Sequence, residues 1–275
     1  MNEYTELLEQ KVMHKDDCNI YYWISRDCGG PWLVFLHGAG TDHRMFSEQI
    51  PVFAGRFKIL LWDARGHGLS RPMGKQFSIK LLVSDLIEIM CREKIDKATL
   101  IGQSMGGNTS QELLFYHPDK VESMVLIDCT CNTMKLSLYE RLLMNSAPVL
   151  LRLLPWKYMV VYSARMSSDK AHVQGYLKEV FQLTGKKNFS TMLFETIACM
   201  HYEKNYRINR EMLLLCGEND KLCNIKKASQ AWALREDKCE FHLINDAGHC
   251  SNQDNSHELN KWLNKFLSVY YGICM

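Results

Sequence analysis

The feature that most constrains this chain is the segment Leu100–Gly107, in which an apolar run ends in the pattern Gly-x-Ser-x-Gly. Ala98–Ile101 is expected to form a strand, and a helix-compatible segment follows the pattern directly. Such a tight turn strains the central serine and leaves no room for bulk at Gly102 and Gly106. Ser104 would then stand at a helix N-terminus, which favours a developing negative charge. In the simpler interpretation, Ser104 only caps the helix.

A second loop with glycines follows the apolar run Trp32–Leu36, which is typical of a strand buried on both faces of a parallel sheet. In this loop, His37–Gly40, the glycines let backbone N–H groups turn toward the space above the strand end. If Ser104 is a nucleophile, this loop and the residue after the serine supply the oxyanion-hole donors. We assign those donors to the N–H groups of Ala39 and Met105. An ordinary β-to-α loop would have a similar composition.

Two later loops supply a candidate acid and a candidate base. Asp220 follows a strand expected over Glu211–Cys216, and His249 follows a strand expected over Cys239–Ile244. A serine hydroxyl is a poor nucleophile unless a base takes its proton, and a carboxylate can hold that base in the correct tautomer. The order serine, acid, histidine along the chain is one of the known orders of a catalytic triad. We therefore predict a triad of Ser104, Asp220 and His249.

Other polar residues also follow predicted strands. Asp128 ends the strand expected over Val121–Ile127 and is the second choice for the triad acid, because open α/β sheets bind ligands at the carboxyl ends of their strands. Asp63 and His67 follow another predicted strand and could be drawn as a catalytic pair. We interpret these two as structural, since a better-placed histidine comes later in the chain.

The order of the predicted elements indicates an α/β fold, with a mostly parallel sheet flanked by helices. Strands are expected at residues 7–14 and 18–25, as a hairpin, and then in alternation with helices at 77–93, 225–235 and 257–270. A short helix is expected over 45–50. Residues 131–207 break the alternation and have helical periodicity, so we expect a helical cap inserted into a core domain of residues 1–130 and 208–275.

Apolar residues of the insertion are candidates for an acyl-binding pocket: Met144, Trp156, Met159, Tyr162 and Phe194. His37 and Cys250, beside the predicted catalytic loops, are further candidates for contact with substrate. For any single residue of the insertion, packing within the insertion itself is the simpler explanation. Cys250 is not expected to be a nucleophile, because no separate base serves it.

Composition excludes several classes of function. Lys and Arg number 33 against 31 for Asp and Glu, so no nucleic-acid partner is expected. The acidic N-terminus lacks the apolar core of a signal peptide, and the broken apolar stretch 150–162 is too short to span a membrane. The eleven cysteines have no zinc-site spacing, so we predict no metal site and free thiols in a reducing cytoplasm.

Five motifs together resemble the landmarks of the α/β-hydrolase superfamily: His37–Gly40, Asp63–Ser70, Gly102–Gly107, Gly217–Asp220 and Asp246–His249. They are most similar to its branch of small soluble esterases, enol-lactonases and cofactor-free haloperoxidase-like enzymes. The resemblance spans the chain except for the insertion. It implies an eight-stranded, mostly parallel sheet, a helical cap after strand six and no cofactor.

Two positions limit which reactions of the superfamily this resemblance implies. Epoxide hydrolases and haloalkane dehalogenases have an aspartate where this chain has Ser104, which argues against those chemistries. Many carbon–carbon bond hydrolases of the superfamily have a tryptophan after the catalytic histidine, where this chain has Cys250. The resemblance therefore favours hydrolysis of an ester-like bond.

The leading hypothesis is a serine hydrolase, similar to carboxylesterases and lactonases, that cleaves a small ester, thioester or lactone. Ser104 would carry the acyl group, His249 would act as general base and Asp220 would orient it. A lyase or acyltransferase on the same site is a second hypothesis, and a non-catalytic small-molecule receptor with a retained triad is a third. The expected protein is cytoplasmic and a monomer or homodimer.

Overall fold

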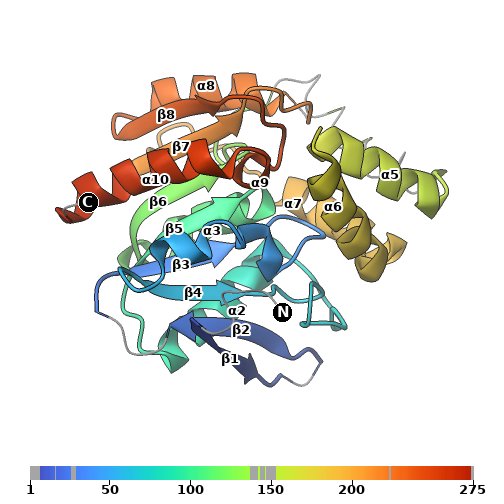
Figure 1. The fold of residues 1–275 in the computed structure, drawn as a ribbon, viewed down its shortest axis with the longest axis horizontal. Coiled ribbons are helices and arrows are strands. Elements are labelled where there is room, and N and C mark those ends of the chain that lie inside the picture. The colour runs from blue at the N-terminus through green and yellow to red at the C-terminus, as the bar shows by residue number, and fades with distance from the viewer. Residues whose placement is uncertain are drawn as a thin grey trace.

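The computed structural model describes residues 7–15, 17–25, 29–136, 142, 146, 153–222 and 224–273. Eight strands form one sheet in the order β1-β2-β4-β3-β5-β6-β7-β8 (Figure 1). Their bounds are β1 Leu8–Met13, β2 Ile20–Ser25, β3 Trp32–Leu36, β4 Lys58–Trp62, β5 Ala98–Gln103, β6 Val121–Ile127, β7 Met212–Gly217 and β8 Cys239–Ile244. The strands predicted from apolar runs are therefore present.

The sheet is mostly parallel, which confirms the predicted fold class. β1 and β2 form an antiparallel hairpin, and β2 is antiparallel to β4. All the other neighbours run parallel, so that Val34 of β3 pairs with Leu60 on one side and with Leu100 on the other. The carboxyl ends of the parallel strands consequently meet at one edge, where the loops with the candidate catalytic residues begin.

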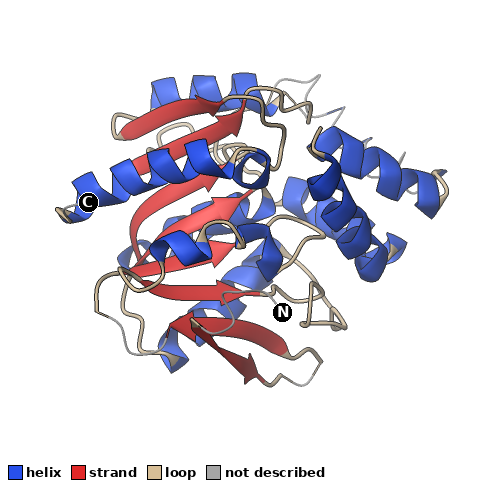
Figure 2. Ribbon diagram, in the orientation of Figure 1, coloured by secondary structure: helices blue, strands red, loops and turns tan. Residues whose placement is uncertain are grey.

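Helices cover both faces of the sheet: in Figure 2 the blue helices lie in front of and behind the red strands. Side chains alternate along each strand, so Leu33 and Phe35 of β3 belong to one hydrophobic cluster and Val34 and Leu36 to the other. The core helices are α1 Ile50–Phe53, α2 Ile79–Arg92, α3 Met105–Tyr116, α8 Ile225–Arg235, α9 Ser251–Asp254 and α10 Ser256–Tyr271. Helices α2, α3 and α8 pack on one face, and α1 and α10 pack on the other.

The short helix predicted over 45–50 is wrong in its bounds. The structure has a 3₁₀ helix, η2, at His43–Phe46 and then α1, with a turn between them. The carboxylate of Asp42 accepts a hydrogen bond from the Arg44 N–H and so starts η2 earlier than the apolar pattern suggests. Pro51 stands in the first turn of α1, where a missing N–H costs nothing, and this favours a new helix there.

In the part of the segment between β6 and β7 that the structure describes, the helices are α5 Trp156–Ser167, α6 Ala171–Thr184 and α7 Lys186–Ala198. In Figure 1 they gather on the side toward which the arrowheads of the parallel strands point. Their buried side chains join the clusters of the sheet: Met159 and Phe181 belong to one cluster and Met192 to the other. These helices therefore share a hydrophobic core with the sheet.

Within the described ranges, none of the helices combines the length and the apolar character that crossing a membrane requires. The cysteines in the same ranges are free thiols, and most of them are buried.

Candidate active site

Ser104 stands between the last residue of β5 and the first residue of α3, with a backbone φ of 50° and ψ of −116°. A positive φ at a residue other than glycine costs on the order of 1–3 kcal/mol and persists only where the surroundings enforce it. Here the helix begins pressed against β3, since a Cβ on Gly106 would lie 1.8 Å from the carbonyl oxygen of Leu36. The Ser104 N–H is also fixed, because it donates to the Ile127 carbonyl of β6 over 2.9 Å.

A continuous hydrogen-bonded chain connects Ser104, His249 and Asp220. His249 Nε2 lies 3.0 Å from Ser104 Oγ, and His249 Nδ1 lies 2.9 Å from Asp220 Oδ2. The Asp220 carboxylate is buried, and its other oxygen accepts the Leu222 N–H over 2.8 Å. The three residues that the sequence analysis placed on separate loops thus meet in space.

This geometry sets the tautomer and the basicity of His249. A proton on Nδ1 is held by the carboxylate, which leaves Nε2 free to accept the Ser104 hydroxyl proton. Burial alone would lower the pKa of His249, but the charge and the hydrogen bond of Asp220 outweigh burial, so this pKa is raised above 6.5. His249 is therefore a stronger base than an ordinary histidine.

Asp128, the second choice for the acid, faces other partners. One oxygen accepts the Gly217 N–H over 2.7 Å, and the other accepts the N–H and the hydroxyl of Ser251 over 2.9 and 2.7 Å. Burial and the nearby charge of Asp220 raise the pKa of Asp128 to about 7. The Asp128 carboxylate therefore connects the end of strand β7 with the segment that follows His249.

One potential ligand atom from each of Asp128, Cys216 and Asp220 lies within 4.8 Å of the other two, a spacing at which one metal ion could contact all three. Both carboxylates are already occupied by backbone N–H groups, a hydroxyl or His249. Burial also raises the pKa of the Cys216 thiol, so this group is a neutral thiol beside the two carboxylates. These donors suit internal hydrogen bonding and do not suit a cation.

Gln103 has a role that the sequence analysis missed. Its side chain is buried, and its Nε2 donates to the His249 carbonyl oxygen over 2.8 Å. The residue before Ser104 therefore ties the β5 strand end to the histidine loop. Position 103 is a variable position of the serine motif, so no pattern in the sequence pointed to this contact.

The loop at residues 37–42, which follows β3, borders Ser104 directly. A Cβ on Gly38 would lie 3.4 Å from the Cβ of Ser104. Ala39 follows on this loop, and Met105 begins α3, where N–H groups have no partner within the helix. Loop 37–42 and the start of α3 thus flank the serine hydroxyl on two sides.

Both ring nitrogens of His37 are engaged within the core. Nδ1 lies 2.8 Å from the Gly38 carbonyl oxygen, and Nε2 accepts the Ala64 N–H over 3.0 Å. Burial lowers the pKa of His37, so the ring is neutral. His37 therefore joins loop 37–42 to the loop after β4, and both of its ring nitrogens are taken up by these contacts and not by a substrate.

Asp63 and His67 lie in the same loop after β4 and make local contacts. One Asp63 oxygen accepts the His43 N–H over 2.7 Å, and the other accepts the Leu69 N–H over 2.7 Å. His67 is buried, with Nδ1 3.0 Å from the Arg65 carbonyl oxygen. These contacts fit the structural interpretation of both residues.

The candidates for the acyl pocket lie in different environments. Met159 is fully buried in a cluster shared with the sheet, whereas Tyr162 is 55% and Phe194 is 49% exposed. Trp156 is partly buried, and its ring meets the edge of Phe189 at 5.8 Å. Met144 lies outside the described residues.

Cys250, the remaining pocket candidate, is buried, and its thiol pKa is raised well above the ordinary value by burial. A buried neutral thiol is inert as a nucleophile, as the sequence analysis expected.

Comparison with known proteins places this geometry in context. A segment of 96 residues of this chain is 32% identical to 3-oxoadipate enol-lactonase 2 of Acinetobacter baylyi. The matched segment covers 35% of this chain and 36% of that curated protein. The chain thus spans only about a third of that relative. A putative carbamate hydrolase of Pseudomonas syringae is 23% identical over 251 residues, covering 87% of this chain and 94% of the relative.

Solved structures share the whole fold. An enol-lactonase of Burkholderia xenovorans has a TM-score of 0.78 at 21% identity, over 94% of this chain and 100% of that one. A thermophilic esterase of Thermogutta terrifontis has a TM-score of 0.80 at 15% identity, over 96% and 98% of the two chains. At these identities the likeness shows the fold alone.

The sequence model of one family, described as serine aminopeptidase, S33, matches residues 31–255. This range includes Ser104, Asp220 and His249, and it covers most of the chain. The chain therefore belongs to the serine aminopeptidase S33 family of the α/β-hydrolase superfamily.

Proposed function

We propose that this protein is a serine hydrolase that cleaves a small carboxylic ester, thioester or lactone through an acyl-enzyme on Ser104. The observation that carries the proposal is the continuous hydrogen-bonded chain from Ser104 Oγ through His249 to the buried Asp220 carboxylate. Membership of a hydrolase family supports the general class of reaction.

In the first half of the reaction, Ser104 Oγ attacks the carbonyl carbon while its proton passes to His249 Nε2. The carbonyl oxygen becomes an oxyanion, which the N–H groups of Ala39 and Met105 would stabilise. His249 then gives the proton to the leaving oxygen or sulfur as its bond to the acyl carbon breaks. An ester or thioester releases an alcohol or thiol, whereas a lactone ring opens and keeps its new hydroxyl on the acyl group, which stays on Ser104. Asp220 remains ionised and stabilises the imidazolium.

In the second half, water attacks the acyl carbon while His249 accepts a proton from it. The Ser104 oxygen leaves as the proton returns to it, and the product is a carboxylic acid. No metal or cofactor enters this sequence of steps, and each proton is moved by His249 alone.

The helices between β6 and β7 support an apolar acyl group. The rings of Phe181 and Phe189 lie 4.7 Å apart and directly above Gly40, two residues beyond Gly38 and its contact with Ser104. We therefore propose that residues 131–207 act as a cap over a core of residues 1–130 and 208–275. Under this cap, the acyl chain would meet aromatic and aliphatic side chains.

The test is turnover of aryl esters from acetate to laurate, together with simple lactones, by the wild type and by Ser104→Ala. Ser268→Ala, on α10, is a matched control for loss of one serine hydroxyl. We expect Ser104→Ala to lose nearly all turnover with an unchanged fold, and we expect a clear optimum of acyl length. Activity retained in Ser104→Ala would show that Ser104 is not the nucleophile. No activity in folded wild-type protein would contradict the proposal and favour the lyase or receptor hypothesis.

A further inference from the structure

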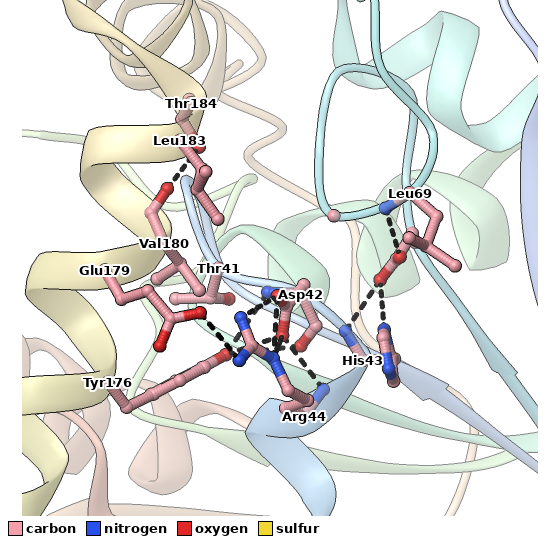
Figure 3. A network of polar contacts seen from close by, with 12 residues as sticks. Thr41, Asp42, His43, Arg44, Leu69, Tyr176, Glu179, Val180, Leu183 and Thr184 are labelled. Carbon is pink, nitrogen blue, oxygen red and sulfur yellow. Dashed lines mark hydrogen bonds and ion pairs between the residues drawn. The ribbon is translucent and has the colours of Figure 1, made fainter. Parts of the chain in front are cut away.

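The far end of loop 37–42 is held by helix α6. Figure 3 shows Tyr176 and Glu179 of α6 facing Asp42 and Arg44. The next residue, His43, is bound to the core, because its N–H donates to Asp63 Oδ1 over 2.7 Å. Residues more than 130 positions apart in the sequence therefore meet at the end of the loop that begins beside Ser104.

Tyr176 makes two hydrogen bonds to one residue. Its hydroxyl donates to Asp42 Oδ1 over 3.1 Å, and its oxygen accepts the Asp42 N–H over 3.3 Å. Because one contact fixes the side chain and the other fixes the backbone, the hydroxyl restrains both at once. Burial has the largest effect on the pKa of Tyr176 and the charge of Asp42 the next largest. Both raise this pKa well above 10, so the hydroxyl keeps its proton.

Arg44 holds the same carboxylate from its other side. Its Nε lies 3.1 Å from both Asp42 oxygens, and its Nη2 lies 2.8 Å from Oδ2. Its Nη1 donates to Glu179 over 2.9 Å, and its guanidinium lies 5.3 Å from the centre of the Tyr176 ring. Burial would raise the pKa of Asp42, but Arg44 outweighs burial and lowers it, so the carboxylate stays ionised.

Gly40 is the second point of attachment. Its carbonyl oxygen lies 3.3 Å from the Thr184 hydroxyl oxygen, which is also 2.9 Å from the Val180 carbonyl oxygen within α6. A Cβ at this position would lie 2.6 Å from the Phe189 ring and 3.0 Å from the Phe181 ring, so the backbone of Gly40 packs directly against α6 and α7. Ala39 lies between this attachment and Gly38, which borders Ser104.

We propose that Tyr176 is a positioning residue for the reaction, acting through Asp42 on loop 37–42 and therefore on the N–H of Ala39. The inference rests on the proposed function, since it assigns the loop the role of oxyanion donor. Helix α6 would then be part of the catalytic machinery as well as part of the cap. The competing explanation is that these contacts only dock α6 on the core.

The decisive variant is Tyr176→Phe, which removes one hydroxyl and leaves the ring. Tyr158→Phe is the matched control, because Tyr158 lies on the neighbouring helix α5 and is 69% exposed. Loss of a direct oxyanion donor lowers kcat about a hundredfold to a thousandfold. Loss of a residue that acts only through the loop should lower kcat less. We expect kcat to fall about tenfold in Tyr176→Phe with KM nearly unchanged, and both constants to be unchanged in Tyr158→Phe.

Affinity for an aryl trifluoromethyl ketone, whose serine adduct carries an oxyanion, separates positioning from docking. We expect this affinity to fall by the same factor as kcat/KM in Tyr176→Phe. A lower Tm or a higher KM with unchanged kcat and unchanged ketone affinity would show that the contact only docks α6.

Amide hydrogen exchange of residues 37–43 gives a readout that needs no turnover. We expect faster exchange there in Tyr176→Phe than in the wild type or in Tyr158→Phe, and unchanged exchange would overturn the inference. If wild-type protein lacked serine-dependent hydrolysis, the proposed function would fail, while the exchange experiment would still decide whether Tyr176 holds the loop.

Discussion

At the scale of single residues, the central question is which carboxylate serves His249. Asp220 contacts Nδ1 directly, whereas Asp128 is engaged by Gly217 and Ser251. We expect Asp220→Asn to lower kcat on the order of ten-thousandfold, because the wrong tautomer of His249 is then favoured. Asp128→Asn should lower kcat about tenfold or less. Steady-state kinetics of the two isosteric variants would refute the assignment if Asp128→Asn were the more damaging.

The raised pKa of His249 predicts a pH dependence. Only the neutral imidazole can accept the Ser104 proton, so kcat/KM should rise with pH as His249 loses its proton. Because the pKa is raised, this rise should be centred above pH 6.5. The charge of Asp128 contributes to the raised pKa, so Asp128→Asn should move the rise to lower pH. A pH–rate profile that is flat, or that moves upward in the variant, would contradict this account.

The residues that stand in a local pattern are those whose meeting in space could be predicted from the sequence. Ser104 stands in a glycine motif, and Asp220 and His249 each follow an apolar strand. Gln103, Asp128 and Tyr176 act through partners that are distant in the chain, and their own neighbours in sequence do not reveal those partners. For that reason Gln103 and Tyr176 were missed, and Asp128 was considered only as an acid.

At the scale of elements, the site depends on how closely α3 approaches β3. A Cβ on Gly106 would meet backbone atoms, which cannot move aside as a side chain can. We expect Gly106→Ala to lower the free energy of unfolding by about 1–3 kcal/mol and to reduce kcat strongly, because Ser104 begins the same turn.

Gly175→Ala is the matched control for Gly106→Ala. Gly175 lies within α6 with nothing within 4 Å of the added Cβ, so alanine there should stabilise the protein by about 0.5–1 kcal/mol. Denaturant titration measures both variants. Equal stability of Gly106→Ala and Gly175→Ala would show that the close approach of α3 to β3 is unimportant.

Elements were predictable where the apolar pattern is unbroken, as in β3, where all of the expected strand is found. The segment around η2 and α1 was not, because the side-chain cap of Asp42 and the ring of Pro51 decide its geometry more than hydrophobic spacing does. Such local hydrogen bonds compete with periodicity over short segments.

At the scale of the whole molecule, the helices between β6 and β7 share one core with the sheet. Met159 of α5 is fully buried in the cluster that contains Phe35 and Ile127 of the sheet. We expect Met159→Ala to lower the free energy of unfolding by about 2–5 kcal/mol. Tyr162→Ala, on the same helix but 55% exposed, should have a much smaller effect.

Denaturant unfolding followed by tryptophan fluorescence and by far-ultraviolet circular dichroism checks this coupling. The shared cluster predicts coincident transitions for the two probes. Separate transitions, with Met159→Ala affecting only one of them, would show that the helices between β6 and β7 unfold independently of the sheet.

The central claim is that Ser104 carries the acyl group, and intact-mass spectrometry of an acid-quenched reaction with a slowly hydrolysed aryl ester tests it most directly. We predict a mass increase equal to the acyl group, mapped to the peptide that contains Ser104 and missing in Ser104→Ala. Turnover without any mass increase, or an acyl group on another residue, would contradict the account.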